Sequence, residues 1–133
     1  MAGIFSRIAS GELSCHKVAE SVDYLAFLDI QPLTKGHTLV IPKKEVDYIF
    51  DMEDPLYQGL FLFGKQVAKA IKKTIPCTRI GIAVIGLEVP HAHIHLVPMN
   101  DAGDLNFSRE KLRPGAEELA ATALSIRSNY PVK

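Results

Sequence analysis

Residues 91–97 read His-Ala-His-Ile-His-Leu-Val, and this run guides the interpretation of the whole chain. Polar and apolar residues alternate along it, a pattern that predicts a β-strand with one buried face. Because side chains two positions apart on a strand point to the same side, we expect His91, His93 and His95 in a row. The apolar residues between them then face the core. Imidazole titrates near neutral pH, so such a row indicates a metal site or chemistry on a charged substrate.

Two functional hypotheses follow from the row of imidazoles. In the first, the row together with His37 binds a transition metal, since neutral imidazole is the commonest ligand for such ions. Successive same-face positions of a strand span too far for three rings to reach one ion, although two of them could. In the second, one imidazole is a nucleophile and its neighbours position or protonate the reacting groups. Three ordinary half-buried histidines are harder to accept, because protonation of adjacent rings would destabilise the strand.

The composition is that of an ordinary globular protein. The chain has 133 residues, 47% apolar and 23% charged, so a single domain over residues 1–133 can form its own core. The formal net charge is zero, which gives no reason to expect nucleic acid or a membrane as partner and is compatible with self-association. Cys15 and Cys77 form no CxxC pair, and no signal peptide or membrane-spanning run is recognisable, so we expect a cytoplasmic protein.

Hydrophobic periodicity predicts an α+β fold. A short helix is expected over Ile4–Ala9, and a long one over Asp54–Thr74, with Asp54 as N-cap and Pro55 in the first turn. The tail is expected to be mostly helical, best over Glu117–Ile126. Five strands are expected, over residues 14–20, 24–30, 37–41, 79–85 and 91–97. Since consecutive strands are usually neighbours, we expect a mostly antiparallel five-stranded sheet with one long covering helix and a C-terminal helix.

The long helix carries two apolar stripes at helical spacing. The first is expected to face the core and consists of Leu56, Leu60, Phe63, Val67 and Ile71. The second, formed by Tyr57, Phe61 and Ala68, is wider than one contact with a sheet needs. It is either additional core or a subunit interface, where Gly59 and Gly64 would permit close approach.

The histidine run resembles the signature of the histidine triad (HIT) superfamily of nucleotide hydrolases and transferases, in which three histidines alternate with apolar residues. The resemblance extends upstream and in the same order: the opening helix followed by Gly11-Glu12, then Leu25–Ile30 followed by Pro32, then Gly36–Lys43. Together these segments cover most of residues 4–98. The resemblance implies a HIT-like fold and a homodimer in which two sheets are joined side by side.

The resemblance also implies a purine nucleotide substrate and roles for four histidines. His93 would attack the α-phosphorus as nucleophile, giving a covalent nucleotidyl-histidine. His95 would hydrogen-bond the phosphate or protonate the leaving group, His91 would orient the row, and His37 would support the reactive tautomer. The chemistry suits imidazole, because its phosphoramidate-type adduct leaves readily once the ring is protonated. No cofactor is expected to be required.

The nucleoside would be held by residues that match the family's binding pocket. Asp29 would accept hydrogen bonds from the ribose hydroxyls, which suits a carboxylate because it would repel phosphate. The base would lie among apolar side chains, namely Ile4, Phe5, Ile8, Phe27, Leu28 and Ile30.

The loop before the histidines departs from the family. Many members have Gly-Gln-Ser/Thr-Val there, whereas this chain has Gly86-Leu87-Glu88-Val89. Leu87 cannot donate a hydrogen bond and an ionised Glu88 would repel phosphate, although the backbone N–H of Val89 could still contact it. Glu88 is either a solvated carboxylate or faces a cationic or amine-bearing leaving group.

The sequence therefore predicts a nucleotide-binding hydrolase, either a nucleoside phosphoramidase or another nucleotidyl hydrolase that acts on dinucleoside polyphosphates. Two alternatives stay open. One is a nucleotide-binding adaptor with weak catalysis, in keeping with the altered loop, and the other is a histidine-ligated metalloprotein.

Overall fold

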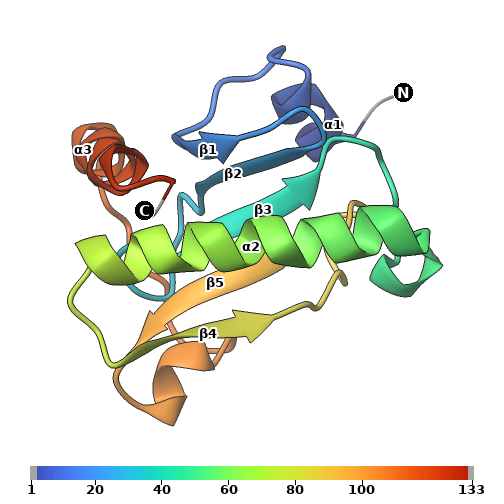
Figure 1. Ribbon diagram of the computed structural model, residues 1–133. Coiled ribbons are helices and arrows are strands. Elements are labelled where there is room, and N and C mark those ends of the chain that lie inside the picture. The colour runs from blue at the N-terminus through green and yellow to red at the C-terminus, as the bar shows by residue number, and fades with distance from the viewer. Residues whose placement is uncertain (1–2, 132–133) are drawn as a thin grey trace.

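The computed structural model describes residues 3–131 and contains a five-stranded sheet with the strand order β1-β2-β3-β5-β4. All four pairings between neighbouring strands are antiparallel. The strands are β1 (Lys17–Glu20), β2 (Tyr24–Leu28), β3 (Thr38–Pro42), β4 (Arg79–Ala83) and β5 (Ile94–Met99). The long helix α2, Asp54–Thr74, crosses one face of this sheet (Figure 1). The predicted α+β fold is confirmed.

Shorter helices complete the fold. They are α1 (Ile4–Ala9), α3 (Ala116–Ser128) and the 3₁₀ turns η1 (Ile49–Asp51) and η2 (Ala102–Leu105). The helix α3 packs against β1 and α2, and α1 lies at the end of the sheet near β1 and β2 (Figure 1). Within residues 3–131, no helix is both long and apolar enough to cross a membrane.

The helix α2 has the bounds that the sequence predicts, with one correction at its start. Its N-cap is Glu53, not Asp54, and Asp54 is the first helical residue. A carboxylate in the first turn is favourable, because it lies near the positive end of the helix dipole. Pro55 costs no hydrogen bond there, since the first N–H groups of a helix have no partner within it.

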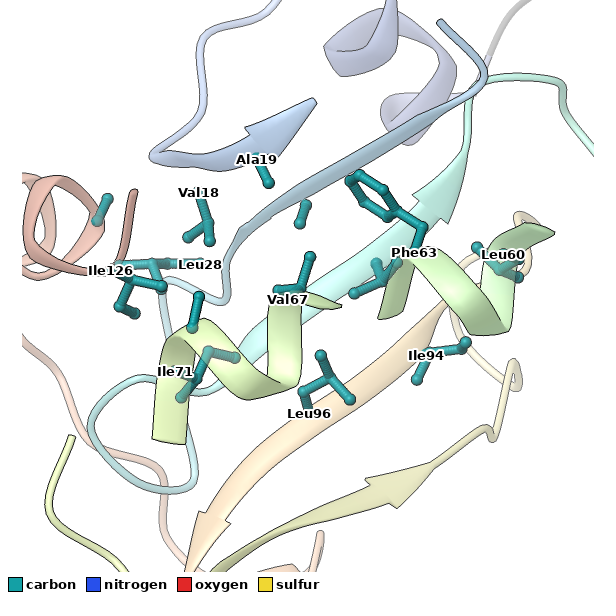
Figure 2. Close-up of a cluster of buried hydrophobic side chains, with 14 of the residues drawn as sticks. Val18, Ala19, Leu28, Leu60, Phe63, Val67, Ile71, Ile94, Leu96 and Ile126 are labelled. Atoms are coloured by element: carbon teal, nitrogen blue, oxygen red, sulfur yellow. The ribbon is translucent and has the colours of Figure 1, made fainter. Parts of the chain in front are cut away.

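Alternation along the strands gives the sheet two different faces. The face under α2 forms the main core, where buried side chains of the sheet and helix interlock, including Val18, Ile94, Leu96, Leu60, Val67 and Ile71 (Figure 2). A second cluster covers the opposite face and contains Phe5, Leu25, Phe27, Leu39 and Ile41. His95 also faces this second side, because it lies between Ile94 and Leu96 along β5.

The start of β5 differs from the prediction. The strand begins at Ile94, so placing His91 and His93 on it is wrong, and His95 is the one member of the run that is a strand residue. The other predicted strand ends are displaced by up to three residues.

The physical reason is that the backbone before β5 bonds elsewhere. The ladder between β3 and β5 starts at the pair Val40 and Ile94. Ahead of it, the N–H of His91 donates to the carbonyl of Val89 at 2.8 Å, which makes a local turn. The N–H of Ala92 donates to the carbonyl of Val46 at 2.7 Å, beyond the end of β3. Loop contacts of this kind leave no local signal in the residue pattern.

Candidate active site

Four buried histidines meet on the sheet face opposite α2. His95 lies on β5, and His37 directly precedes β3, the strand that pairs with β5. Ring centroids are 5.2 Å apart for His37 and His95, and 4.8 Å apart for His93 and His95. His91 is joined to His93 through its backbone carbonyl. The structure thus brings together all four histidines singled out by the sequence.

Hydrogen bonds fix the tautomers of His37 and His95. The backbone N–H of Leu33 donates to Nδ1 of His37 at 3.0 Å, so this nitrogen is an acceptor and the ring proton lies on Nε2. Nε2 of His37 is 3.0 Å from Nδ1 of His95 and therefore donates to it. In a neutral His95 the proton is then on Nε2. The pair presents one N–H donor, on His95, to the surface of the site.

His93 has the opposite arrangement. Its Nδ1 is 2.7 Å from the carbonyl oxygen of His91, which can only accept a hydrogen bond, so Nδ1 carries the ring proton. Nε2 of His93 is left with a lone pair. A neutral imidazole held in this tautomer is suited to nucleophilic attack.

His91 links three parts of the chain. Its Nε2 donates to the carbonyl of Pro42 at 2.7 Å, and its Nδ1 is 3.5 Å from the hydroxyl of Ser6 on α1. The same hydroxyl donates to the carboxylate of Glu45 at 2.8 Å. The ring of Phe5 lies 5.9 Å from the ring of His91 and 5.1 Å from that of His93. His91 is therefore hydrogen-bonded to the end of β3 and packs against Phe5 of α1, and its carbonyl supports the position of His93.

Burial favours the neutral form of three of these imidazoles, those of His37, His91 and His95. Loss of solvation lowers the pKa of His37 to about 3 and that of His95 to about 4, with neighbouring histidines adding to the effect. Burial also lowers the pKa of His91. The pKa of Asp29 is raised by burial, against a hydrogen bond from the N–H of Gln31 that lowers it. The hydrogen-bonded pair of His37 and His95 is thus neutral and lies beside one carboxyl group.

One group of atoms could surround a metal ion. A carboxylate oxygen of Asp29 and one nitrogen each of His37 and His95 lie within 4.8 Å of one another. Nε2 of His37 would have to lose its proton to bind an ion, and the hydrogen bond from Leu33 to Nδ1 opposes that. His91 and His93 contribute nothing to the group. The geometry fits a neutral hydrogen-bonded pair better than it fits a metal centre.

The predicted base-binding residues divide into two sets. Phe5 and Phe27 contact each other on the histidine face, with ring centroids 5.5 Å apart, and Ile8 packs against the same cluster. Ile4 is 51% exposed and Ile30 63% exposed, so both lie at the surface and outside this cluster. Leu28 does not join them, since it points into the main core beside Ile126 (Figure 2). Leu28 follows Phe27 on β2, and successive side chains of a strand face opposite sides.

The predicted phosphate loop lies beside a hollow that reaches His93. Glu88 and Leu87 are exposed, whereas Val89 packs against the cluster on the histidine face. The hollow measures about 350 Å³. Its walls come from η1, the second stripe of α2 and the loop after β4, including Tyr48, Phe50, Tyr57, Phe61, Ile85 and Leu87. The second stripe is therefore only partly core.

Two contacts of the site were not predicted from the sequence. The Leu33 N–H is a backbone group and leaves no trace in residue identity. Phe107 lies far along the chain, in a segment without periodicity, yet its ring centroid is 4.7 Å from that of His95. No pattern in the sequence connects Phe107 to the histidines.

Comparison with known proteins agrees with this geometry. The sequence model of the HIT domain matches residues 10–102. The chain belongs to the HIT family. Among its relatives, the adenosine 5′-monophosphoramidase hnt1 of Schizosaccharomyces pombe is 35% identical over 130 residues, which cover 96% of this chain and 98% of that protein.

Solved HIT structures have the same fold as this HIT protein. A Hit-like protein of Bartonella henselae superposes with a TM-score of 0.82 at 28% identity, over 95% of each chain. A histidine triad nucleotide-binding protein of Sulfolobus tokodaii superposes with a TM-score of 0.79 at 25% identity, over 93% of this chain and 89% of its own. The recognition of the family from the histidine run is confirmed.

Proposed function

We propose that this HIT protein is a nucleotide hydrolase that cleaves nucleoside phosphoramidates at the α-phosphate through a covalent intermediate on His93. The observation that carries the proposal is the pair of opposite tautomers, a free Nε2 lone pair on His93 beside a free Nε2–H on His95. A nucleophile and a hydrogen-bond donor on adjacent rings are what attack on a phosphoryl group needs. The similarity to an adenosine 5′-monophosphoramidase supports the substrate class.

The reaction takes place in two displacements. In the first, Nε2 of His93 attacks the phosphorus, a P–N bond to the ring forms, and the P–N bond to the amine breaks. The amine leaves with the electron pair and takes up one proton. In the second, water attacks the adduct, the bond to His93 breaks, and one proton is released. The proton that the amine takes up in the first displacement is thus balanced by the proton that water releases in the second.

The surrounding residues stabilise these steps. The Nε2–H of His95 hydrogen-bonds an oxygen of the phosphoryl group, where negative charge is concentrated. The carbonyl of His91 accepts from Nδ1–H of His93, which stabilises the positive charge on the ring in the adduct. Asp29 binds the ribose hydroxyls, and Phe5 and Phe27 contact a purine base. Substrates with other leaving groups, such as dinucleoside polyphosphates, would be attacked by His93 at the α-phosphorus in the same way.

Replacement of the nucleophile tests the proposal. His93→Ala should reduce turnover of adenosine 5′-phosphoramidate to background while nucleotide binding, measured by calorimetry, is kept. In the unmodified protein, quenched single-turnover samples should contain a nucleotidylated species in intact-mass spectra. His16→Ala, which changes a histidine outside the site, is the matched control. Turnover by His93→Ala at the rate of the unmodified protein would exclude His93 as nucleophile.

The alternatives predict different results in the same experiments. An adaptor would bind the mononucleotide without turning over any leaving group, which the exposed Leu87 and Glu88 of the phosphate loop would favour. A metalloprotein would lose activity on chelation. Turnover that survives chelation and depends on His93 supports the hydrolase.

We also propose that the protein is a homodimer joined through β4. Among the described strands β4 has one neighbour, β5, so its other edge is free to pair. A large apolar side chain is exposed on this strand, since Ile82 is 55% accessible. Ile82→Lys should convert a dimer into a monomer in multi-angle light scattering, whereas Val22→Lys, on the turn between β1 and β2, should not. A monomeric unmodified protein would refute the assembly without affecting the chemistry.

A further inference from the structure

A strap of residues 106–112 crosses the histidine face after η2. It is fixed at both ends, since the N–H of Asn106 donates to the carbonyl of Gly103 at 3.2 Å and the N–H of Leu112 donates to the carbonyl of Pro32 at 2.9 Å. In its middle, Arg109 contacts Asp104 at 3.0 Å. Within it, Nζ of Lys111 donates to the carbonyl of Phe107 at 2.7 Å. These bonds hold the aromatic ring of the strap in place.

Phe107 covers the hydrogen-bonded pair of imidazoles. Its ring meets His95 at a centroid distance of 4.7 Å and an interplanar angle of 72°. It meets His37 at 6.2 Å and 83°. Both contacts are T-shaped, a favourable arrangement for aromatic rings. The ring therefore lies against both members of the pair at once.

The hydrogen bond from His37 to His95 exists only while both rings are neutral. A proton on Nδ1 of His95 would place two N–H groups against each other across the 3.0 Å contact with His37. Asp29 would favour such a charge, with a carboxylate oxygen 3.7 Å from Nε2 of His37, whereas Lys111 and His93 oppose it. Exclusion of water from the rings is the remaining factor, because an imidazolium without solvation is unfavourable.

We propose that Phe107 is a positioning residue that excludes water from the His37–His95 pair and so keeps the pair neutral and hydrogen-bonded, with the Nε2–H of His95 held toward the phosphate. The effect of Phe107 on the protonation of the pair can be measured without any catalysis. Its effect on turnover rests on the proposed function. Phe107 itself touches no reacting atom in this arrangement.

Histidine NMR tests the effect on the pair. In protein labelled with ¹⁵N-histidine, His37 and His95 should keep the shifts of neutral, fixed tautomers down to about pH 5. In Phe107→Ala, the titration midpoint of His95 should rise by about one pH unit and its two nitrogens should approach each other in shift, because part of the burial is lost. Phe107→Leu, which stays apolar, should shift the midpoint less. Unchanged midpoints and tautomers in Phe107→Ala would overturn the proposal.

A control separates positioning from loss of stability. Phe63→Ala removes a ring from the other face of the sheet, where Phe63 stacks on Tyr24. It should lower the melting temperature without changing the titration of His95. If Phe107→Ala does not fold, Phe107→Gln, which is polar and of similar length, replaces it, and a midpoint equal to that of the unmodified protein counts against Phe107.

Kinetics test the consequence for turnover. Phe107→Ala should lower kcat for adenosine 5′-phosphoramidate about tenfold, leave KM within about a factor of two, and move the acid limb of the pH–rate profile to match the NMR midpoint. Phe107→Leu should recover most of kcat. A shifted NMR midpoint with an unshifted profile would refute the role of the pair in turnover. An unmodified protein without turnover would refute the proposed function, while the NMR result still decides the role of Phe107.

Discussion

Acidification from pH 7.5 to pH 5 should destabilise this protein through two buried histidines. Burial lowers the pKa of His37 from 6.5 to about 3 and that of His95 from 6.5 to about 4. Below pH 6.5 the unfolded chain therefore binds protons that the folded chain does not bind. The contribution of each ring to the free energy of unfolding is complete above pH 6.5 and is lost as the pH falls toward the folded-state pKa.

The size of the loss follows from the width of that window. One pH unit corresponds to about 1.4 kcal/mol for each ring, so the interval from 6.5 to 5 removes about 2 kcal/mol per ring and about 4 kcal/mol for both. The lowered pKa of His91 acts in the same direction. The raised pKa of Asp29 acts in the opposite direction, because the folded chain then retains a proton that the unfolded chain has lost. The net loss should thus be large for a domain of this size.

Urea denaturation at half-unit pH intervals measures this loss directly, followed by circular dichroism. The free energy of unfolding should fall steeply between pH 6.5 and pH 5, with an unchanged m-value. His16→Gln, outside the site, should give the same profile. A flat profile over this interval would mean that His37 and His95 titrate normally, and the argument for a neutral hydrogen-bonded pair would be refuted.

Four further substitutions test the two faces of the sheet, ribose binding and the turn before His37. Leu28→Ala should cost about 3 kcal/mol in urea denaturation because it opens a cavity in the main core, yet KM should stay unchanged, whereas Phe27→Ala should raise KM. Asp29→Asn should raise KM for a ribonucleotide about tenfold and have little effect on a dideoxy analogue; equal effects on both would count against ribose binding. Gly36→Ala should cost about 1–3 kcal/mol in thermal unfolding, since its φ is +92° and a Cβ would lie 2.9 Å from Ile75.

The sequence was informative where the periodicity was strong. The bounds of α2 follow from the Asp54-Pro55 start and from apolar spacing, and both survive in the structure. The histidines were found because identical polar residues recur in an apolar run. The prediction was wrong about where β5 begins, because the alternation of polar and apolar residues is the same for His95 on the strand and for His93 in the loop before it.

The features of the site that the sequence did not predict depend on contacts between residues far apart in the chain. The position of Phe107 depends on how the chain returns from η2, and its partners His37 and His95 lie 70 and 12 positions earlier in the numbering. Leu28 was placed with the base-binding residues by resemblance, whereas simple alternation next to Phe27 would have placed it in the core. Here the local physical rule was the better guide.

The two tautomers of the site are set by main-chain groups, the amide of residue 33 and the carbonyl of residue 91. Every amino acid supplies that carbonyl, and every one except proline supplies that amide. Mutational drift at position 33 can thus alter packing but leaves the location of the protons intact. What natural variation must preserve there is the path of the polypeptide, and an alignment of side chains would not reveal it.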